Sequence, residues 1–366
     1  MQDKTDYMKI SITLIITSCI SLLLLGQNNE NIINSNSKHG KKYKTKVVRG
    51  FDEYKDFDFK WIKVKKNNKY GLIDSIGKEI LPVQYDYISG VFNGMFLVQK
   101  YEENNTRRIK ECSLINSSGN ILLHFDENNG YNNNSILGFY INGLVTVKIN
   151  NSVALYSSAG QLLPPIYKSI IVYYDKWVVA INKEDKYELY TVEGNKIDSY
   201  DYLQFIEQDT ARILSGKKIG YMNFETGDFI QEDKIQDEMN KLKIIYEKIS
   251  IERLIGNSYD IKIPNPPLGF KSAMAKEIVF PYKLIEDNIN DVRVILKFIV
   301  NSKGEISSVF VKSNLNLIGD GMEENAIKAI YGTRSLKWDL ATIDGLPVDF
   351  YFRSPITFRI PVEKNE

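Results

Sequence analysis

Few residues in this 366-residue chain have the type and spacing that catalysis requires. The only histidines are His39 and His124, and the only cysteines are Cys19 and Cys112. A metal site or a histidine-based catalytic triad needs several such side chains to converge. Carboxylates are plentiful, but no motif marks a pair for general acid and base work. We therefore expect no catalytic residue, no metal and no cofactor, and interpret the protein as non-enzymatic.

The composition excludes some classes of partner. Lys and Arg number 47 against 46 for Asp and Glu, which leaves a net charge of +1. Such a balance argues against a nucleic-acid surface or a polybasic membrane patch. Hydrophobic residues at 43% and charged residues at 25% are typical of folded protein. The length leaves room for two or three domains.

The N-terminus carries an apolar run from Ile10 to Leu25, preceded by Lys9 and followed by Gly26. A basic residue, an apolar core and a small closing residue are typical of an export signal. Two alternatives stay open: a lipid anchor on Cys19, in a bacterial lipobox-like setting, and a short uncleaved membrane anchor. We expect export, with residues 1–26 as signal peptide or anchor and 27–58 as a polar linker.

The clearest sequence pattern lies in residues 69–85. Two short apolar runs, Leu72-Ile73 and Ile80-Leu81, flank a turn in which Gly77 can take the positive φ that a tight turn needs. Pro82 has no N–H to donate, so we expect it where the strand leaves its ladder. The pattern predicts a β-hairpin, which cannot bury its apolar face alone and must be stacked with other copies.

Weakened copies of this hairpin follow along the chain. Their turn glycines are Gly77, Gly119, Gly160, Gly194 and Gly227, and the last three are 34 and 33 residues apart. We expect a mainly β repeat array of about five antiparallel hairpin units over residues 59–232. Its many aromatic residues, Trp177 among them, are expected to form the stacked core rather than a sugar-binding platform.

The hairpin pattern resembles the WG repeat. The matching positions are Gly71, Asp74, Gly77, Pro82 and Tyr85. Tyr70 stands where the repeat has its signature tryptophan, and the middle copies lack the second-position glycine. The resemblance implies a β-rich interaction scaffold with no catalytic residue.

A different periodicity follows the repeats. Apolar residues at mostly three-to-four spacing predict a helical connector over residues 233–258. Residues 259–269 contain Pro264, Pro266 and Pro267 and are expected to form a stiff joint between two independently folding units.

The C-terminal segment, residues 270–361, predicts an α+β domain. Strands are expected at 292–300, 306–311 and 348–360, with a tight turn at 301–304 and an amphipathic helix at 322–330. This order is β-β-α-β with a three-stranded antiparallel sheet.

The segment resembles the C-terminal domain of TonB, the periplasmic energy-transducer family. The order and spacing of six residues carry the resemblance: Pro281, Gly304, Trp338, Gly345, Pro347 and Pro355. It implies capture of an extended receptor peptide beside the last strand by β-augmentation. The expected docking edge contains Val348, Asp349, Tyr351, Arg353 and Ser354. The alternative is that this edge is covered and the domain is purely structural.

The sequence therefore predicts a non-catalytic binding or scaffold protein in the periplasm or envelope of a Gram-negative bacterium. Its partner would be an envelope protein or receptor peptide, with membrane association possible through the N-terminus and no nucleic acid. A TonB-type energy transducer for outer-membrane transport is the alternative, and an enzyme acting on envelope polymers is a third hypothesis. The identity of the partner and the oligomeric state stay open.

Overall fold

A computed structural model describes residues 47–102, 109–126, 135–216, 218–232, 260–278, 291–311 and 321–359. The predicted signal, the predicted helical connector and Pro281 lie outside the described residues.

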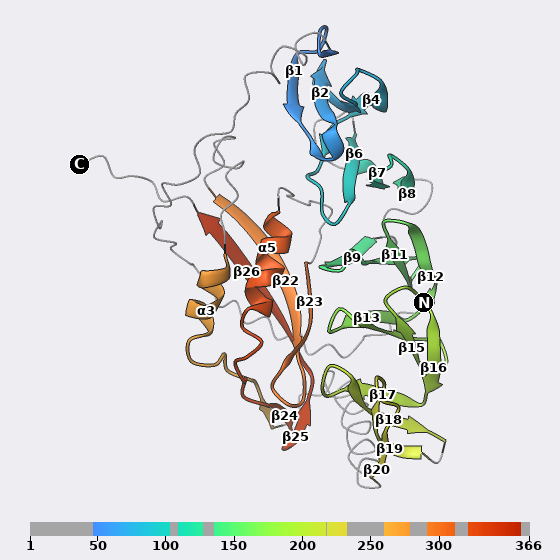
Figure 1. Ribbon diagram of the computed structural model, residues 1–366, viewed down its shortest axis with the longest axis vertical. Helices are drawn as coiled ribbons and strands as arrows, with labels where there is room; N and C mark the ends of the chain where they lie inside the picture. Colours follow the sequence, from blue (N-terminus) through green and yellow to red (C-terminus); the bar gives the residue numbers. More distant parts are fainter. Residues whose placement is uncertain are drawn as a thin grey trace, which may run out of the picture.

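Antiparallel four-stranded groups make up the repeat region, one group after another along the chain. Figure 1 shows them stacked along the long axis of the molecule, from blue to yellow. The first two groups are β1 (Glu53–Asp56), β2 (Ile62–Lys66), β3 (Lys69–Ile73) and β4 (Glu79–Tyr85), then β5 (Tyr87–Ile88), β6 (Met95–Tyr101), β7 (Ile109–Asn116) and β8 (Ile121–Asp126). The third is β9 (Ser135–Tyr140), β10 (Val145–Ile149), β11 (Ser152–Ser157) and β12 (Gly160–Tyr167). The last two are β13 (Ser169–Tyr173), β14 (Trp177–Ile181), β15 (Tyr187–Thr191) and β16 (Lys196–Tyr200), then β17 (Tyr202–Phe205), β18 (Thr210–Ser215), β19 (Lys218–Asn223) and β20 (Phe229–Gln231).

The repeat begins earlier than the sequence predicts. Strand β1 and Asp58, the first residue of the 3-10 turn Asp58–Lys60, fall within the expected linker, and Val48 in the same segment is buried. The predicted hairpins are present, each as part of a four-stranded group. In the first, third and fourth groups the last strand ends at a tyrosine, and the first strand of the next group begins two residues later. Tyr85 ends β4, and Tyr87 begins β5.

The turns share one chemistry. Asp74 Oδ1 accepts hydrogen bonds from the N–H groups of Ile76 and Lys78, both at 2.9 Å. Asn116 in the second unit and Asn223 in the fifth accept turn N–H groups in the same way, Asn116 from Ser118 and Asn120 and Asn223 from Glu225 and Thr226. A short polar side chain at this position satisfies the turn backbone, which explains why the pattern keeps one there.

The C-terminal elements lie beside the array in orange and red in Figure 1. They are β21 (Ile261–Lys262), α3 (Phe270–Glu277), β22 (Asp291–Val300), β23 (Ile306–Val311), α5 (Met322–Tyr331), β24 (Ala341–Ile343), β25 (Leu346–Val348) and β26 (Phe350–Arg359). The long hairpin, the helix after it and the last strand occur where predicted. Helix α3 and the small sheet β21-β24-β25 were not predicted, and the last strand is split at Asp349.

The expected three-stranded sheet is part of a larger one. Strands β23, β22 and β26 are neighbours in that order, and β23 continues onto β9 through Phe310↔Tyr140 and Val311↔Phe139. The result is a seven-stranded sheet, β12-β11-β10-β9-β23-β22-β26. A pairing between strands so distant in sequence leaves no local pattern, so the sequence could not predict it.

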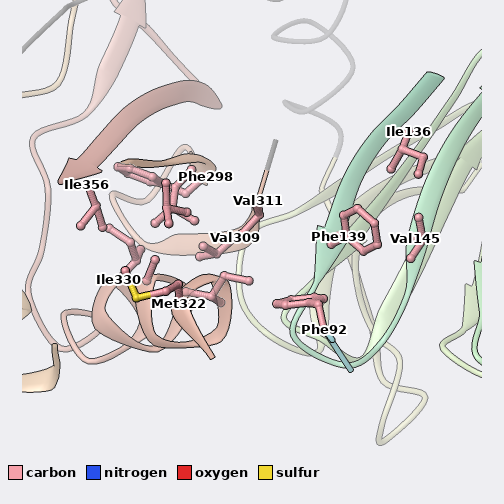
Figure 2. Close-up of a cluster of buried hydrophobic side chains, with 14 of the residues drawn as sticks. Phe92, Ile136, Phe139, Val145, Phe298, Val309, Val311, Met322, Ile330 and Ile356 are labelled. Carbon is pink, nitrogen blue, oxygen red and sulfur yellow. The ribbon is translucent and has the colours of Figure 1, made fainter. Parts of the chain in front are cut away.

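One hydrophobic cluster spans both regions of the chain. Figure 2 shows Phe92, Phe139 and Val145 of the repeats in the same cluster as Val311 and Met322 of the C-terminal region. Helix α5 buries its apolar face against β22 and β23, as its spacing predicts. The regions on either side of the proline-rich joint therefore share a core.

Candidate functional site

Strand β26 is the outermost strand of the seven-stranded sheet in the described part of the chain. It pairs with β22 over ten residue pairs, from Val300↔Phe350 to Asp291↔Arg359. We call the side of β26 that faces away from β22 the open edge. Backbone N–H and C=O groups on such an edge are available to an added strand.

The position of Pro355 indicates which residues aim their backbone groups at the open edge. Pro355 pairs with Ile295 in the middle of the ladder, although proline has no N–H to donate. It fits there when its nitrogen faces away from β22. Because backbone groups alternate along a strand, Arg353 and Thr357 share this outward direction. The open edge thus offers donors on both sides of Pro355 and none at Pro355 itself.

The structure places the five expected docking residues in different surroundings. Val348 is buried in β25, and Asp349 lies between β25 and β26. Ser354 is buried in β26, whereas Tyr351 and Arg353 are half-buried there. Only Tyr351, Arg353 and Ser354 of the five expected residues therefore belong to β26. Peptide docking at this strand stays a prediction.

Aromatic side chains fix β26 against the C-terminal core. The Phe352 ring stacks on Phe298 at a centroid distance of 5.0 Å and contacts Trp338 at 4.7 Å. The backbone N–H of Trp338 donates to the Gly304 carbonyl at 3.0 Å. Gly304 has φ +78°, and a Cβ there would overlap the Trp338 carbonyl oxygen. These contacts explain the TonB-like residues Gly304 and Trp338 by packing alone.

The other TonB-like positions lie at turns and edges. Gly345 has φ +80° and joins β24 to β25, and Pro347 pairs with Thr342 within that hairpin. Together with Pro355, they shape the approach to β26 and its ladder rather than forming a chemical site.

The repeat motif also has a structural explanation. Gly71 lies at a bulge where β3 meets β4, and a Cβ there would come within 2.7–2.9 Å of Leu81 and Val83. Gly77 has φ +91°, Pro82 is exposed on the edge strand β4, and Tyr85 is buried in the core. None of these residues lines a binding site in the described structure.

The start of β26 is attached to the repeats by Asp349. Its Oδ1 accepts hydrogen bonds from Gln204 Nε2 at 2.7 Å and from the Ser302 N–H at 3.1 Å. Burial raises the pKa of Asp349 to about 6, while these hydrogen bonds and the charge of Arg212 oppose the rise. One carboxylate thus joins the fifth repeat, the β22–β23 turn and the last strand.

Further polar contacts reinforce this junction. The Asn301 side chain donates to the Tyr174 hydroxyl and to the Ile206 carbonyl, both at 2.9 Å. The Tyr331 hydroxyl donates to Asp175 Oδ1 at 2.7 Å. Burial raises the pKa of Asp175, and the Tyr331 hydrogen bond opposes this. Nothing in the sequence pattern signals these long-range pairs.

A cavity of about 220 Å³ lies at the same junction. Residues of the repeats and of the C-terminal region both line it. The lining includes the aromatic and polar residues Tyr173, Tyr187, Tyr202, Gln204, Asp349 and Tyr351. The sequence suggested that the tyrosines are core residues; Tyr173 is buried, whereas Tyr187 and Tyr202 are half-buried and face the cavity.

The sequence does not predict that Ser113, His124 and Asp126 lie in a line, which the structure shows. Ser113 Oγ lies 2.9 Å from His124 Nδ1, and His124 Nε2 lies 3.6 Å from Asp126 Oδ2. These types resemble a catalytic triad, but Ser113 is buried in β7, a strand paired on both sides, so its neighbouring N–H groups are already used in ladders. An acyl-transfer site needs free donors for an oxyanion. We assign this line a structural role.

The remaining chemical groups give no further site. Burial raises the pKa of the Cys112 thiol to about 12, which keeps it in its unreactive form. Within the described ranges no group of three His, Cys, Asp or Glu residues is arranged to hold a metal ion. No helix in the described part of the chain is both long and apolar enough to cross a membrane.

Comparison with known proteins identifies one repeat. Residues 70–102 match the model of the WG containing repeat, so the chain contains a WG repeat and is a mainly β repeat protein. The curated proteins include no match.

Two solved structures are similar over about half of each chain. A eukaryotic initiation factor has 12% identity and a TM-score of 0.24, covering 50% of this chain and 54% of its own. The C-terminal WD40 domain of Sif2 has 12% identity and a TM-score of 0.20, covering 47% and 54%. Scores this low carry no argument about this protein.

Proposed function

We propose that this chain is a binding protein that pairs an extended peptide with strand β26, while its repeats act as the scaffold that holds this strand. The observation that carries the proposal is the one-sided ladder of β26, which has ten pairs with β22 and no neighbour on the open edge among the described strands. Main-chain hydrogen bonds would supply most of the affinity.

The burial of the strand supports this proposal. One face of β26 packs through Phe352 on Phe298 and Trp338, and Tyr351 packs on the cluster of the fourth and fifth repeats. A strand held on both faces loses little conformational freedom when a peptide is added, which favours binding. Arg353 and Thr357 are half-buried and lie on either side of Pro355.

The proposed setting is the bacterial cell envelope, with an envelope protein or receptor peptide as partner. The motivation is the apolar run from Ile10 to Leu25 together with the TonB-like order of Gly304, Trp338 and Pro355. Energy transduction would additionally require the N-terminal run to stay in the inner membrane. Recovery of the full-length chain from washed inner membranes would favour that role over a released binding protein.

A pair of variants at one residue tests peptide pairing. The outward N–H of Arg353 is removed in Arg353→Pro and retained in Arg353→Ala, so the proline should abolish binding and the alanine should change it only modestly. Binding is measured by fluorescence anisotropy on labelled extended peptides from the periplasmic face of outer-membrane receptors. Circular dichroism must show both variants folded. Equal affinity of the two folded variants would rule out pairing at this edge.

A further inference from the structure

We propose that the cavity between the last two repeats and the start of β26 binds a small organic cation through the Asp349 carboxylate and surrounding tyrosine rings. This site is separate from the open edge, and its test does not depend on peptide pairing. At about 220 Å³ the cavity is far larger than the roughly 10–15 Å³ that one water needs. It therefore admits a ligand of several heavy atoms.

The Asp349 carboxylate is hydrogen-bonded through only one of its two oxygens in the described structure. Both hydrogen bonds that this carboxylate receives go to Oδ1, and none from the described residues reaches Oδ2. No Lys or Arg of the described ranges forms an ion pair with it within 4.0 Å. A carboxylate inside a protein is ordinarily paired with a cation, because burial disfavours an isolated charge. Arg212 acts on Asp349 through its charge, and a ligand cation in the cavity would add a positive charge in direct contact with the carboxylate.

Several tyrosine side chains line the same cavity as Asp349. Burial raises the pKa of Tyr173 well above its ordinary value, and Tyr351, Asp349, Tyr187 and Tyr202 raise it further. These groups are therefore close enough to interact around one space. The Tyr187 and Tyr202 rings lie 5.5 Å apart between centroids. Aromatic faces attract organic cations, most strongly where water is excluded.

The geometry also fixes the anionic group in place. The Tyr202 hydroxyl donates to Gln204 Oε1 at 3.0 Å, and Gln204 Nε2 donates in turn to Asp349. A carboxylate held by such a chain is ready to meet a ligand without reorganising. Lys262 also lines the cavity, and the positive charge of Arg212 is close enough to lower the pKa of Asp349. Because these two cations would repel a second positive charge, a ligand with one positive centre fits better than a dication.

The test measures binding of simple cations to the intact protein by isothermal titration calorimetry. Choline and butylammonium are the probes, and 3,3-dimethylbutan-1-ol is the neutral isostere of choline. We expect one saturable site for at least one cation and at least tenfold weaker binding of the isostere. Tyr187→Leu removes one aromatic face and should weaken binding roughly 2- to 30-fold.

Asp349→Asn removes the charge but keeps an oxygen for Gln204 and Ser302, and it should weaken binding tenfold or more. Glu184→Gln changes an exposed carboxylate of the fourth repeat and should leave affinity unchanged. If Asp349→Asn does not fold, the isostere and Tyr187→Leu decide the question. No saturable cation binding, or equal binding of choline and its isostere, would overturn the proposal.

Affinity should also fall as the pH drops below about 6, because a proton then competes with the cation for Asp349. The other groups facing Asp349 are Lys262, Arg212 and the tyrosines. A flat pH profile would contradict the role of the carboxylate.

Discussion

At the residue scale, Asp349 joins three segments that are distant in the sequence. It accepts hydrogen bonds from the fifth repeat and from the β22–β23 turn, and it immediately precedes β26. A single carboxylate at such a junction makes the attachment of the last strand sensitive to its protonation state.

This sensitivity gives a prediction for stability. The pKa of Asp349 is raised from 3.8 to about 6, so its ionised form is less favourable in the folded protein than in the unfolded chain. The contribution of Asp349 to the free energy of unfolding is fully present below about pH 4, where the carboxyl is protonated. This contribution is lost as the pH rises through about 6. The loss is on the order of 2–3 kcal/mol.

Urea denaturation of the wild type and Asp349→Asn between pH 4 and 7.5 measures this contribution. The wild-type free energy of unfolding should fall relative to that of the variant as the pH rises. Parallel curves for the two proteins would contradict the raised pKa.

The sequence predicts structure correctly where a residue interacts only with its neighbours along the chain. Asp74 and Gly77 were predicted as a turn, and they form one through short-range hydrogen bonds and a positive φ. Asp349 was placed on the docking edge because it alternates with apolar neighbours, but its partner Gln204 lies 145 residues away. No local pattern reports such a pair.

At the element scale, the C-terminal strands and helices differ in how clearly the sequence predicts them. The hairpin β22–β23 and helix α5 follow apolar spacing and were predicted. Helix α3 was not, because Phe270 and Met274 are its only buried residues and this leaves a weak periodicity. Strand β26 was predicted as an edge, and it has one strand neighbour in the described structure.

Trp177 tests how the repeat sheets pack together. Its ring is buried, stacks on Phe205 at 6.2 Å between centroids, and donates from Nε1 to the Gln208 carbonyl at 2.8 Å. Trp177→Ala should therefore lower the free energy of unfolding by roughly 3–5 kcal/mol. The exposed Ile197→Ala should change it by less than about 0.5 kcal/mol and serves as the control in chemical denaturation. A loss below ~1 kcal/mol at Trp177 would mean that the ring is not a packing centre.

Pro355 tests the direction of the backbone groups on β26. Pro355→Ala adds an N–H to the open edge, which should increase self-association through edge pairing. Sedimentation velocity measures the monomer fraction at increasing protein concentration. Adding Arg353→Pro to this variant removes another outward N–H and should lower self-association to the wild-type level. Unchanged association in Pro355→Ala would mean that the proline nitrogen does not face the open edge.

At the scale of the whole molecule, the two sequence regions form one connected structure. The seven-stranded sheet passes from β9 of the repeats to β23 of the C-terminal region, and one hydrophobic cluster includes side chains from both. Ile299 and Tyr351 also pack on the cluster of the last two repeats. The sequence predicted two modules because its composition changes at the proline-rich joint, whereas their contacts are visible only in three dimensions.

The shared core gives a prediction for fragments. A fragment that begins at Gly269 exposes Ile299 and the outer edge of β23, so we expect it to unfold at lower denaturant concentration than the C-terminal region of the full chain. Pulse proteolysis in urea compares the two. Equal resistance would show that the C-terminal region folds as an independent unit.

Hydrogen exchange along β26 is the most direct test of the proposed docking edge. In the free, full-length protein the outward N–H groups of Arg353 and Thr357 should exchange fast, while those of Phe352 and Ile356, paired with β22, should exchange slowly. An extended envelope peptide that binds should slow exchange at Arg353 and Thr357 and leave the inner pair unchanged. Slow exchange at both outward positions before any peptide is added would show that the edge is already covered and would contradict peptide pairing at β26.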